Sequence, residues 1–437
     1  MLTLKVITEN QNGVIRQLAK KHFDAKEITD RIIALDAVRR ASQSALDAGL
    51  TEINRLSKTI GGLMKEGKPA EAGNARLRVA ELKEKNRALE TAKAGAETEL
   101  RECLALIPNL PHESVPEGKG AGDNVCERTG GVVPELPDDA LPHWDLARKY
   151  GLIDFESGVK ITGAGFPVYR GYGARLQRAL INFFLDQAVE AGYAEVEPPY
   201  LVNADSAYGT GQLPDKEGQM YHVGPDGLYL IPTAEVPVTN LYRDVILDES
   251  ELPVRHTAYS ACFRREAGSY GKEVRGLNRL HQFNKVEIVC IDKPEHSYQT
   301  LQEMVDYVQS LVEKLELPWR MLRLCGGDIS FTSALTFDFE VFAAAQQRWL
   351  EVSSVSNFES YQANRLKCRY RDEHKKTQLC HTLNGSALAL PRIVAALLEN
   401  NQTADAIRIP GALVPYTGFE RIEWLRRITP NDTSLKS

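Results

Sequence analysis

The strongest chemical signal is a stretch in which charged and aromatic side chains recur at a spacing of two residues. Arg264 and Glu266 stand at the end of one expected strand, so their side chains lie on the same face. Phe283, Lys285 and Glu287 follow with the same spacing in a second expected strand, after a loop with three glycines. The pattern predicts a hairpin that gathers cations, an aromatic ring and two carboxylates on one surface. Arg-x-Glu alone would also fit an exposed, salt-bridged hairpin.

The sequence contains neither of the two common phosphate-binding glycine motifs. It has no Gly-x-x-x-x-Gly-Lys-Ser/Thr and no Gly-x-Gly-x-x-Gly. A bound nucleotide must therefore have its phosphates held in another way. A guanidinium group is the natural substitute, because it meets phosphate or carboxylate oxygens with two parallel hydrogen bonds.

The first third of the chain has the periodicity of two long helices. Alternating steps of four and three residues from Ile28 to Leu63 fall on eleven positions, and eight of them are apolar. This seam stops at residues 67–69, Gly-Lys-Pro, which break a helix. A second seam runs from Val79 to Ile107. We expect an antiparallel coiled-coil hairpin whose first helix is about 60 Å long.

The rest of the chain mixes strands and helices after a Pro/Gly-rich stretch. The expected fold class is α+β, with a mainly antiparallel β-sheet flanked by helices. The pattern predicts helices at 173–191, 295–315 and 387–400, strands at 255–264, 282–291, 336–341 and 349–354, and an extended segment at 194–202. The expected domains are a helical arm at 1–110, a linker at 111–125, a mixed domain of strands and helices at 126–428 that contains the candidate site residues, and a polar tail at 429–437.

Composition favours a cytoplasmic protein without a membrane span. The chain is 43% hydrophobic and 26% charged, with a net charge of −6. No apolar run approaches the roughly 20 residues that span a bilayer, and the N-terminus lacks signal-peptide features. The seven cysteines include no Cys-x-x-Cys pair, so we expect no zinc site. Residues 1–107 hold 19 Lys/Arg against 15 Asp/Glu, whereas the remainder holds 34 against 44. This asymmetry fits an anionic partner for the arm, and it fits an ordinary solvated helical surface equally well.

Together these stretches resemble the motifs of the class II aminoacyl-tRNA synthetases, in the form found in seryl-tRNA synthetases. Residues 263–287 resemble motif 2, residues 383–400 resemble motif 3, and residues 197–202 resemble motif 1. Residues 231–235 resemble the serine-specific Thr-x-Glu loop, and residues 351–354 resemble the segment that holds ATP and metal. Each piece is short, but the combination covers nearly the whole chain, including the helical hairpin.

The resemblance implies that motifs 2 and 3 form two walls of one ATP site that activates a carboxylate. Arg264 would bridge the α-phosphate and the amino-acid carboxylate, and Glu266 would accept a hydrogen bond from the adenine amino group. Phe283 and Arg392 would enclose the adenine ring, and Arg392 would also reach the γ-phosphate. The residues expected to bind ATP are Arg264, Arg265, Glu266, Leu280, Phe283, Glu351, Val352, Ser353, Ser354 and Arg392, of which Arg264 and Arg392 are the expected catalytic residues.

The same resemblance implies L-serine as the amino acid and Mg²⁺ as the cofactor. The expected serine-binding residues are Thr233, Ala234, Glu235, Arg264, Glu287 and Ser386. The expected metal ligands are Glu351 and Ser354, because Mg²⁺ prefers oxygen ligands and phosphates. The implied reaction makes seryl-adenylate and pyrophosphate from serine and ATP, and then loads the 3′-terminal ribose of serine tRNA. A carboxylate is ionised at neutral pH, so the first step needs no protein nucleophile.

The implied partners are serine tRNA, with selenocysteine tRNA as a second candidate, and another copy of the chain in a homodimer. The arm would recognise the tRNA by contacts to its backbone. The candidate contacts, which the heptad pattern does not rank, are Arg31, Arg39, Arg40, Arg55, Lys58, Arg76, Arg78, Lys83, Lys85 and Arg87.

Two departures from the family pattern and two alternative functions accompany this interpretation. Arg265 stands where a small polar residue is common, and its side chain is expected to point away from the adenine. Leu390-Pro391 precedes Arg392 where the family more often has a glycine, so the local start of the helix is expected to differ. The first alternative is a ligase that loads seryl-adenylate onto a carrier protein, which would give the basic arm nothing to bind. The second is a non-catalytic coiled-coil scaffold, which the full set of motif residues argues against.

Overall fold

The computed structural model describes residues 1–215, 217–266 and 275–423. The polar tail predicted at 429–437 lies outside the described residues, as do two of the three loop glycines, Gly268 and Gly271. The chain divides into two compact units, Met1–Leu110 and Pro111–Ser437.

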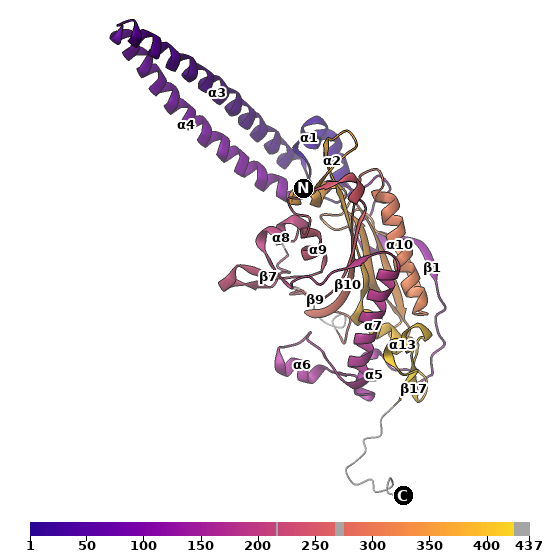
Figure 1. The fold of residues 1–437 in the computed structure, drawn as a ribbon. Coiled ribbons are helices and arrows are strands. Elements are labelled where there is room, and N and C mark those ends of the chain that lie inside the picture. Colours follow the sequence, from indigo (N-terminus) through magenta and orange to yellow (C-terminus); the bar gives the residue numbers. More distant parts are fainter. Residues whose placement is uncertain (216, 267–274, 424–437) are drawn as a thin grey trace. The chain divides into compact units, whose positions relative to one another are not determined.

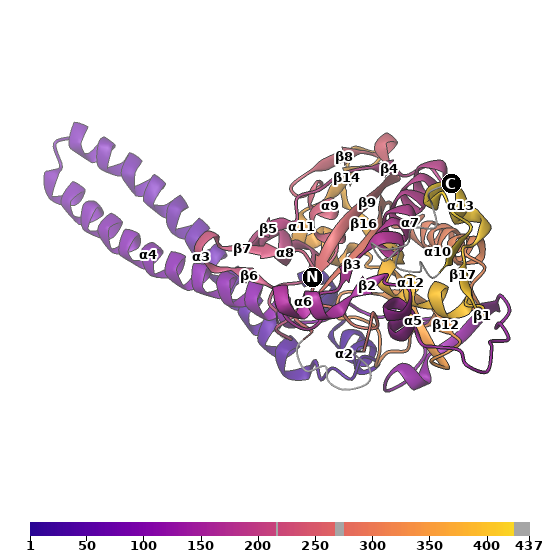
Figure 2. The same cartoon turned by 90° about the horizontal axis from the view of Figure 1, so that it is seen from below.

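The first unit is helical. Two short helices, α1 (Leu4–Glu9) and α2 (Gln11–Ala19), precede two long ones, α3 (Lys26–Lys65) and α4 (Pro69–Leu106). Figures 1 and 2 show α3 and α4 side by side as an antiparallel hairpin, which confirms the prediction. Proline begins α4, where its missing N–H would have no partner within the helix in any case.

The seam between α3 and α4 contains a close approach as well as apolar contacts. Ile32, Leu46 and Leu56 of α3 are buried, as the heptad pattern predicts. Gly49 lies in the same seam, where an added Cβ would be 2.2 Å from Oδ1 of Asn86 on α4. Only glycine permits this approach, so the pair fixes the level at which the two helices meet.

The second unit is built on a mainly antiparallel sheet of eight strands, in the order β1-β11-β12-β13-β16-β10-β9-β4. Only the short pairing of β4 with β9 is parallel among the described ladders of this sheet. The strands are β1 (Val125–Gly130), β4 (Ala194–Glu195), β9 (Val254–Phe263), β10 (Gln282–Asp292), β11 (Trp319–Arg323), β12 (Leu335–Ala343), β13 (Arg348–Asn357) and β16 (His381–Ala389). The expected α+β class with a mainly antiparallel sheet is confirmed (Figure 1).

Helices cover this sheet and close its hydrophobic core. The helices that contact the central strands include α7 (Gly171–Glu190), α10 (Ser297–Lys314) and α12 (Leu390–Asn400), and α5 (His143–Lys149) packs against α12. Every residue of α12 is buried except Arg392, which is partly exposed. Most residues of α12 are apolar on every side of the helix, so the helix lies inside the fold, and this burial fixes the position of its one cationic side chain.

The start of α12 differs from the prediction. The predicted helix begins at residue 387, but residues up to Ala389 belong to β16. Pro391 is the second residue of α12, where a helical residue needs no N–H partner, so the proline is compatible with the helix start. Arg392 consequently lies in the first turn of the helix.

Residues 111–125, predicted as a linker, are bound to the second unit. The His112 N–H donates to the Ala334 carbonyl at 2.8 Å, and the Gly326 N–H donates to the Pro116 carbonyl at 2.9 Å. Val115 is buried in the main core. The Pro/Gly content of this segment therefore marks an irregular path along a surface rather than a free connection.

Smaller elements complete the second unit. They are β2 (Ile153–Asp154), α6 (Phe155–Ile161), β3 (Val168–Tyr169), β5 (Leu201–Asn203), α8 (Ala204–Thr210), β6 (His222–Val223), β7 (Leu228–Leu230), α9 (Glu235–Asn240), β8 (Ile246–Asp248), α11 (Ser360–Leu366), β14 (Arg369–Arg371), β15 (Thr377–Leu379), β17 (Ala406–Arg408), α13 (Val414–Thr417) and β18 (Arg421–Glu423). Within the described ranges, none of the helices has the length and apolar character needed to cross a bilayer.

Candidate active site

A cavity of about 540 Å³ lies against the central strands of the sheet. It brings together residues from β10, β13, β16, α12 and the segment after β9. The predicted site residues that line it are Thr233, Glu235, Arg264, Glu266, Leu280, Phe283, Glu351, Val352, Ser353, Ser354, Ser386 and Arg392. Segments separated by more than 150 residues in the sequence thus form one concave surface.

Three predicted residues do not line the cavity. Ala234 is completely buried beneath it. Arg265 is exposed, and its backbone N–H donates to the Gln219 carbonyl at 2.9 Å. Its neighbours Arg264 and Glu266 both line the cavity, whereas Arg265 does not. Glu287 is 1% exposed and lies behind the lining residues, where it contacts Thr233 and other side chains.

Arg264 lines the cavity directly after the end of β9. Its backbone N–H donates to the His281 carbonyl at 2.9 Å, which continues the pairing between β9 and β10. Its Nε donates to the Pro232 carbonyl at 3.4 Å. The guanidinium carbon is 5.2 Å from the centre of the Phe283 ring. The Arg264 side chain thus stands between an aromatic surface and the polar loop that carries Thr233.

Glu266 and Arg279 form an ion pair at the edge of the cavity. The Arg279 Nε and the Glu266 Oε2 are 3.0 Å apart, and both residues line the cavity. Glu266 adopts a φ of +47°, a conformation that is uncommon for residues other than glycine. Strand geometry therefore ends at Phe263, and a turn directs the Glu266 carboxylate.

Arg392 is held by backbone oxygens from two other segments. Its Nε donates to the Asn278 carbonyl at 3.1 Å, and its Nη1 donates to the Glu351 carbonyl at 2.6 Å. The carboxylate of Glu351 is 3.6 Å from the same Nη1. These contacts connect the first turn of α12 with β13 and with the segment before β10.

A buried polar network closes the other end of the cavity. Thr233 Oγ1 donates to Glu287 Oε2 at 2.8 Å and accepts a hydrogen bond from Lys285 Nζ at 3.0 Å. Asn384 Nδ2 donates to Glu235 Oε2 at 2.9 Å and to Glu287 Oε1 at 3.1 Å. Two carboxylates therefore share one amide group, with one ammonium group beside them.

The charge of Glu235 depends on this burial. Removal from water, followed by the proximity of Glu287, raises the pKa of Glu235 to about 7. Gln362 Nε2 donates to Glu235 Oε1 at 2.6 Å and opposes the shift. A ligand that carries a positive charge would favour the ionised form of this carboxyl group.

Sequence reasoning missed three residues of the network. Lys285 is on the predicted face of β10 but has no assigned role there. Asn384 is two positions before Ser386, so strand alternation in β16 places both on one face. Gln362 reaches the site from α11 and has no sequence signal that would identify it.

The predicted metal ligands lie beside a third acidic residue. Asp338 on β12 is the cross-strand partner of Ser354 on β13. Burial, together with the nearby Glu351, raises the pKa of Asp338 well above its ordinary value. Its Oδ1 is buried and makes no hydrogen bond within the described part of the chain. In the same part, three or more His, Cys, Asp or Glu side chains do not cluster as a metal site.

Comparison with protein families and curated relatives gives a consistent result. Residues 1–111 match the seryl-tRNA synthetase N-terminal domain, and residues 221–401 match the tRNA synthetase class II core domain (G, H, P, S and T). The chain is 50% identical to a serine–tRNA ligase from Salinibacter ruber, over 97% of this chain and 99% of that protein. It is 47% identical to one from Akkermansia muciniphila, over the same shares of the two chains.

Solved structures show the same relationship. Seryl-tRNA synthetase from Pyrococcus horikoshii, complexed with ATP, is 33% identical and superposes with a TM-score of 0.92, over 97% of this chain and 100% of that one. Cytoplasmic serine–tRNA ligase from Naegleria fowleri, in complex with AMP, is 26% identical with a TM-score of 0.86, over 97% and 99%.

Proposed function

Because the chain belongs to the seryl-tRNA synthetase family, we propose that its cavity binds ATP and L-serine side by side and joins them as seryl-adenylate. The chain is a class II aminoacyl-tRNA synthetase, which is a ligase. The observation that carries the proposal is the position of Arg264, between the polar network of Thr233 and the aromatic surface of Phe283. One guanidinium there can contact both an amino-acid carboxylate and an α-phosphate.

The first chemical step is a displacement at phosphorus. A serine carboxylate oxygen forms a bond to the α-phosphorus of ATP, and the bond to the bridging oxygen breaks to release pyrophosphate. The chain positions the two reactants and stabilises the negative charge that develops on the phosphate oxygens. In this proposal Arg264 acts at the α-phosphate, and Arg392, which lies in the first turn of α12, acts at the γ-phosphate.

The polar network is the proposed serine site. The ammonium group of serine would lie near Glu235, and the hydroxyl group near Ser386 and the carboxylates behind it. A pocket that pairs a hydroxyl leaves buried polar groups unsatisfied when alanine enters, and such sites discriminate by about 10⁴-fold. The neighbouring Lys285 forms an ion pair with Glu287 and donates to Thr233, so this carboxylate has a cationic partner when serine is absent.

Mg²⁺ is proposed as the cofactor at Glu351 and Ser354. The unsatisfied, buried Oδ1 of Asp338 next to Ser354 supports this, because oxygen donors of this kind suit a hard cation. The bound ion would neutralise part of the charge on the nucleotide phosphates. We expect Ser354→Ala to raise the Mg²⁺ concentration needed for half-maximal pyrophosphate exchange, with the serine KM unchanged. The same Mg²⁺ requirement in the variant and in the wild type would contradict these ligands.

The second step transfers the seryl group to tRNA. A hydroxyl of the 3′-terminal ribose attacks the carbonyl carbon of seryl-adenylate, and AMP leaves. Residues 1–110 are the proposed tRNA-binding arm, 111–125 the connection, and 126–428 the proposed catalytic domain. Serine tRNA is the proposed acceptor, and selenocysteine tRNA is a second substrate to be tested.

The basic residues of the arm can be ranked as candidate tRNA contacts by whether they already form an ion pair with a carboxylate. Arg55 pairs with Glu52 and Arg78 pairs with Glu81 on their own helices. Candidates that are exposed and make no ion pair within the described residues are Lys58, Arg76, Lys83 and Lys85. A cation without a carboxylate partner is free to neutralise a phosphate, so these four are the preferred contacts.

The experiment that tests the function is serine-dependent exchange of pyrophosphate into ATP, followed by charging of serine tRNA. Pyrophosphate exchange with another amino acid but not with serine would contradict the assignment of serine as the substrate. Adenylate formation without tRNA charging would favour the carrier-protein alternative. A homodimer in the cytoplasm is part of the same proposal, and a monomer in sedimentation at working concentration would contradict that assembly.

A further inference from the structure

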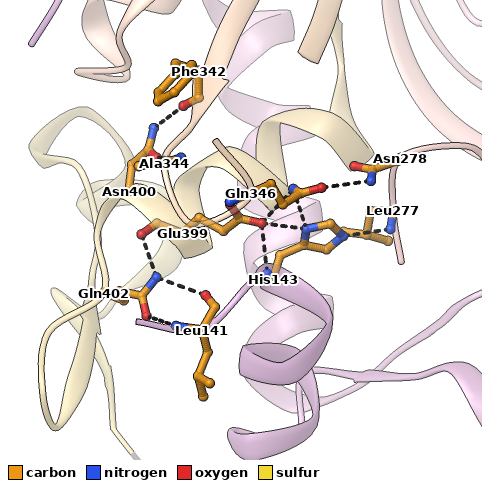
Figure 3. Close-up of polar contacts among 10 residues, drawn as sticks. All are labelled: Leu141, His143, Leu277, Asn278, Phe342, Ala344, Gln346, Glu399, Asn400 and Gln402. Carbon is orange, nitrogen blue, oxygen red and sulfur yellow. Dashed lines mark hydrogen bonds and ion pairs between the residues drawn. The ribbon is translucent and has the colours of Figure 1, made fainter. Parts of the chain in front are cut away.

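A second polar group, completely buried and outside the cavity, joins α5 to the end of α12 (Figure 3). His143 and Glu399 are both 0% exposed. The backbone N–H of His143 donates to Glu399 Oε1 at 2.9 Å, and His143 Nδ1 is 2.8 Å from the same oxygen. Gln346 adds two more donors to this carboxylate, from its backbone N–H at 3.0 Å and its Nε2 at 2.7 Å. Glu399 is therefore paired by four donors, which a buried carboxylate requires.

The other side of His143 faces the segment that leads into β10. The Leu277 N–H donates to His143 Nε2 at 2.9 Å, which makes Nε2 an acceptor. The ring proton is therefore on Nδ1, where it is donated to Glu399. The same imidazole thus connects the last turn of α12 to the backbone of Leu277.

The neighbouring residues of this segment fit the same surface. Gly276 adopts a φ of +67°, and a Cβ added there would be 2.3 Å from His143 Nε2. The Arg275 guanidinium lies 4.5 Å from the centre of the Trp144 ring. Asn278 Nδ2 donates to Gln346 Oε1 at 2.9 Å. Arg275, Leu277 and Asn278 are therefore each held by α5 or by Gln346, and Gly276 allows the backbone between them to approach His143 closely.

The held segment is part of the ATP cavity. Leu277, Asn278, Arg279 and Leu280 all line it. The Asn278 carbonyl also accepts the hydrogen bond from Arg392 Nε. Arg392 and Glu399 are seven residues apart on α12, about two turns, and both contact this assembly. Helix α12 therefore holds the segment in two ways. Arg392 in its first turn contacts Asn278 directly, and Glu399 in its last turn contacts Leu277 through His143.

We propose that His143, Glu399 and Gln346 form an anchor group that positions residues 275–280 and, through the Asn278 carbonyl, the Arg392 guanidinium for ATP. These three are positioning residues, since none of them lines the cavity. The inference rests on the proposed function, because it assigns them to the ATP side of that reaction. Without the Nε2 acceptor, the buried Leu277 N–H loses its partner, and the segment no longer favours one arrangement.

Two variants of His143 test separately the two hydrogen bonds that its ring makes, with Glu399 and with Leu277. In His143→Asn, the amide nitrogen can replace Nδ1 as a donor to Glu399, but the acceptor for Leu277 is lost. In His143→Gln, the amide oxygen can replace Nε2 as that acceptor. The control is His381→Asn, because His381 pairs with the Ser297 hydroxyl at 2.7 Å and neither residue lines the cavity.

The readouts are the KM values for ATP and for serine in pyrophosphate exchange, together with Tm. We expect His143→Asn to raise the ATP KM roughly tenfold and to leave the serine KM within about twofold. His143→Gln should raise the ATP KM less, and His381→Asn should leave it unchanged. A fall in Tm with an unchanged ATP KM in both His143 variants would overturn the proposal. An equal rise in the two KM values would overturn it as well.

Amide hydrogen exchange of the full chain gives a readout that needs no activity. In the absence of ATP, a peptide covering residues 275–283 should exchange faster in His143→Asn than in His143→Gln. Equal exchange in the two variants would overturn the anchor group, even when one variant is too unstable for kinetics. If the wild type shows no serine-dependent pyrophosphate exchange, the proposed function is rejected instead. The comparison of amide hydrogen exchange would still decide whether the anchor group exists.

Discussion

The Lys285 ammonium group donates a hydrogen bond to the Thr233 hydroxyl at 3.0 Å, although 52 positions separate the two residues in the chain. The side chain of Lys285 is 7% exposed, and it also forms an ion pair with Glu287, whose side chain is 1% exposed. One buried lysine thus lies beside the carboxylates at the end of the cavity that is proposed to bind serine. Its removal would leave a buried negative charge without a cation.

We therefore expect Lys285→Met to lower the free energy of unfolding by about 3–5 kcal/mol, as loss of one partner of a buried ion pair does. Saturating serine should restore more stability to this variant than to the wild type, because the serine ammonium replaces the missing cation. Chemical denaturation with and without serine measures both effects. The matched control is Lys293→Met, since the Lys293 pair with Glu249 is more exposed and lies outside the cavity. Equal losses in the two variants would contradict the assigned role.

Arg264→Ala should lower kcat/KM for pyrophosphate exchange at least about 100-fold, because it removes a guanidinium aimed at the charge of the transition state. Arg265→Ala is the matched control, because this neighbour has the same charge but does not line the cavity. Its activity should stay within about threefold of the wild type, as is usual for an exposed side chain. Similar losses in both variants would show that local charge, rather than position, matters.

The raised pKa of Glu235 predicts a pH dependence of serine binding. Below about pH 7 the carboxyl group is increasingly protonated and neutral, so it attracts the serine ammonium less. The serine KM should consequently rise as the pH falls from 8 to 6, while the ATP KM changes little. In Glu235→Gln the serine KM should be higher at every pH and should lose this slope. An unchanged slope in the variant would assign the titration to another group.

The same shift has a consequence for stability. The folded pKa lies above the ordinary value of 4.5, so the folded chain binds this proton more tightly than the unfolded chain does. The stabilisation is present below about pH 4.5 and is lost as the pH rises to about 7, for a total of about 3 kcal/mol. Unfolding free energies of Glu235→Gln, measured across this range, should lack that decrease. A parallel decrease in the variant would contradict the assignment.

Deletion of residues 30–100 should abolish tRNA charging and spare most pyrophosphate exchange. The ends of this segment meet in the hairpin, because Arg31 Nε donates to Glu99 Oε1 at 2.7 Å, so a short glycine linker can join them. Equal loss of both activities would contradict the division between arm and catalytic domain.

Replacement of the unpaired cations should distinguish contacts from ordinary surface charge. Alanine at Lys58, Arg76 and Lys83 together should raise the tRNA KM. It should also make the plot of log binding constant against log salt concentration less steep, by an amount that corresponds to about three fewer neutralised phosphates. The control replaces Arg55, Arg78 and Arg87, which pair with carboxylates on their own helices. Binding measured at several salt concentrations should separate the two sets. Equal slopes would show that the ion pairs do not rank the contacts.

The sequence predicts β9, β10, β12 and β13 of the main sheet, but not β1, β11 or β16. The pattern for 282–291 matches β10 to within one residue, because valine and isoleucine recur in this stretch and glycines precede it in the sequence. Strand β16 is not predicted, because nearly all of its residues are buried on both faces. A continuous buried run has no alternation and cannot be told from a buried helix, so the start of α12 is predicted too early.

The candidate site is predictable where motif residues face the cavity, and less so where partners come from elsewhere. Strand alternation places Arg264 and Phe283 correctly, yet the pairing of Glu266 with Arg279 depends on a turn with positive φ. Gln362 and His143 lie far from the motifs in sequence. Their roles depend on tertiary packing, which no local pattern encodes.

The place of β16 in the sheet has a consequence for synthesis of the protein. This strand lies between β13 and β10, which precede it in the chain. A ribosome-bound chain that has reached residue 380 therefore carries two incomplete half-sheets, each with an open edge that can pair with another chain. The strand that closes them also delivers Ser386, and the helix after it delivers Arg392. On the roles proposed for these two residues, we expect serine activation to begin only after β16 and α12 have completed the fold.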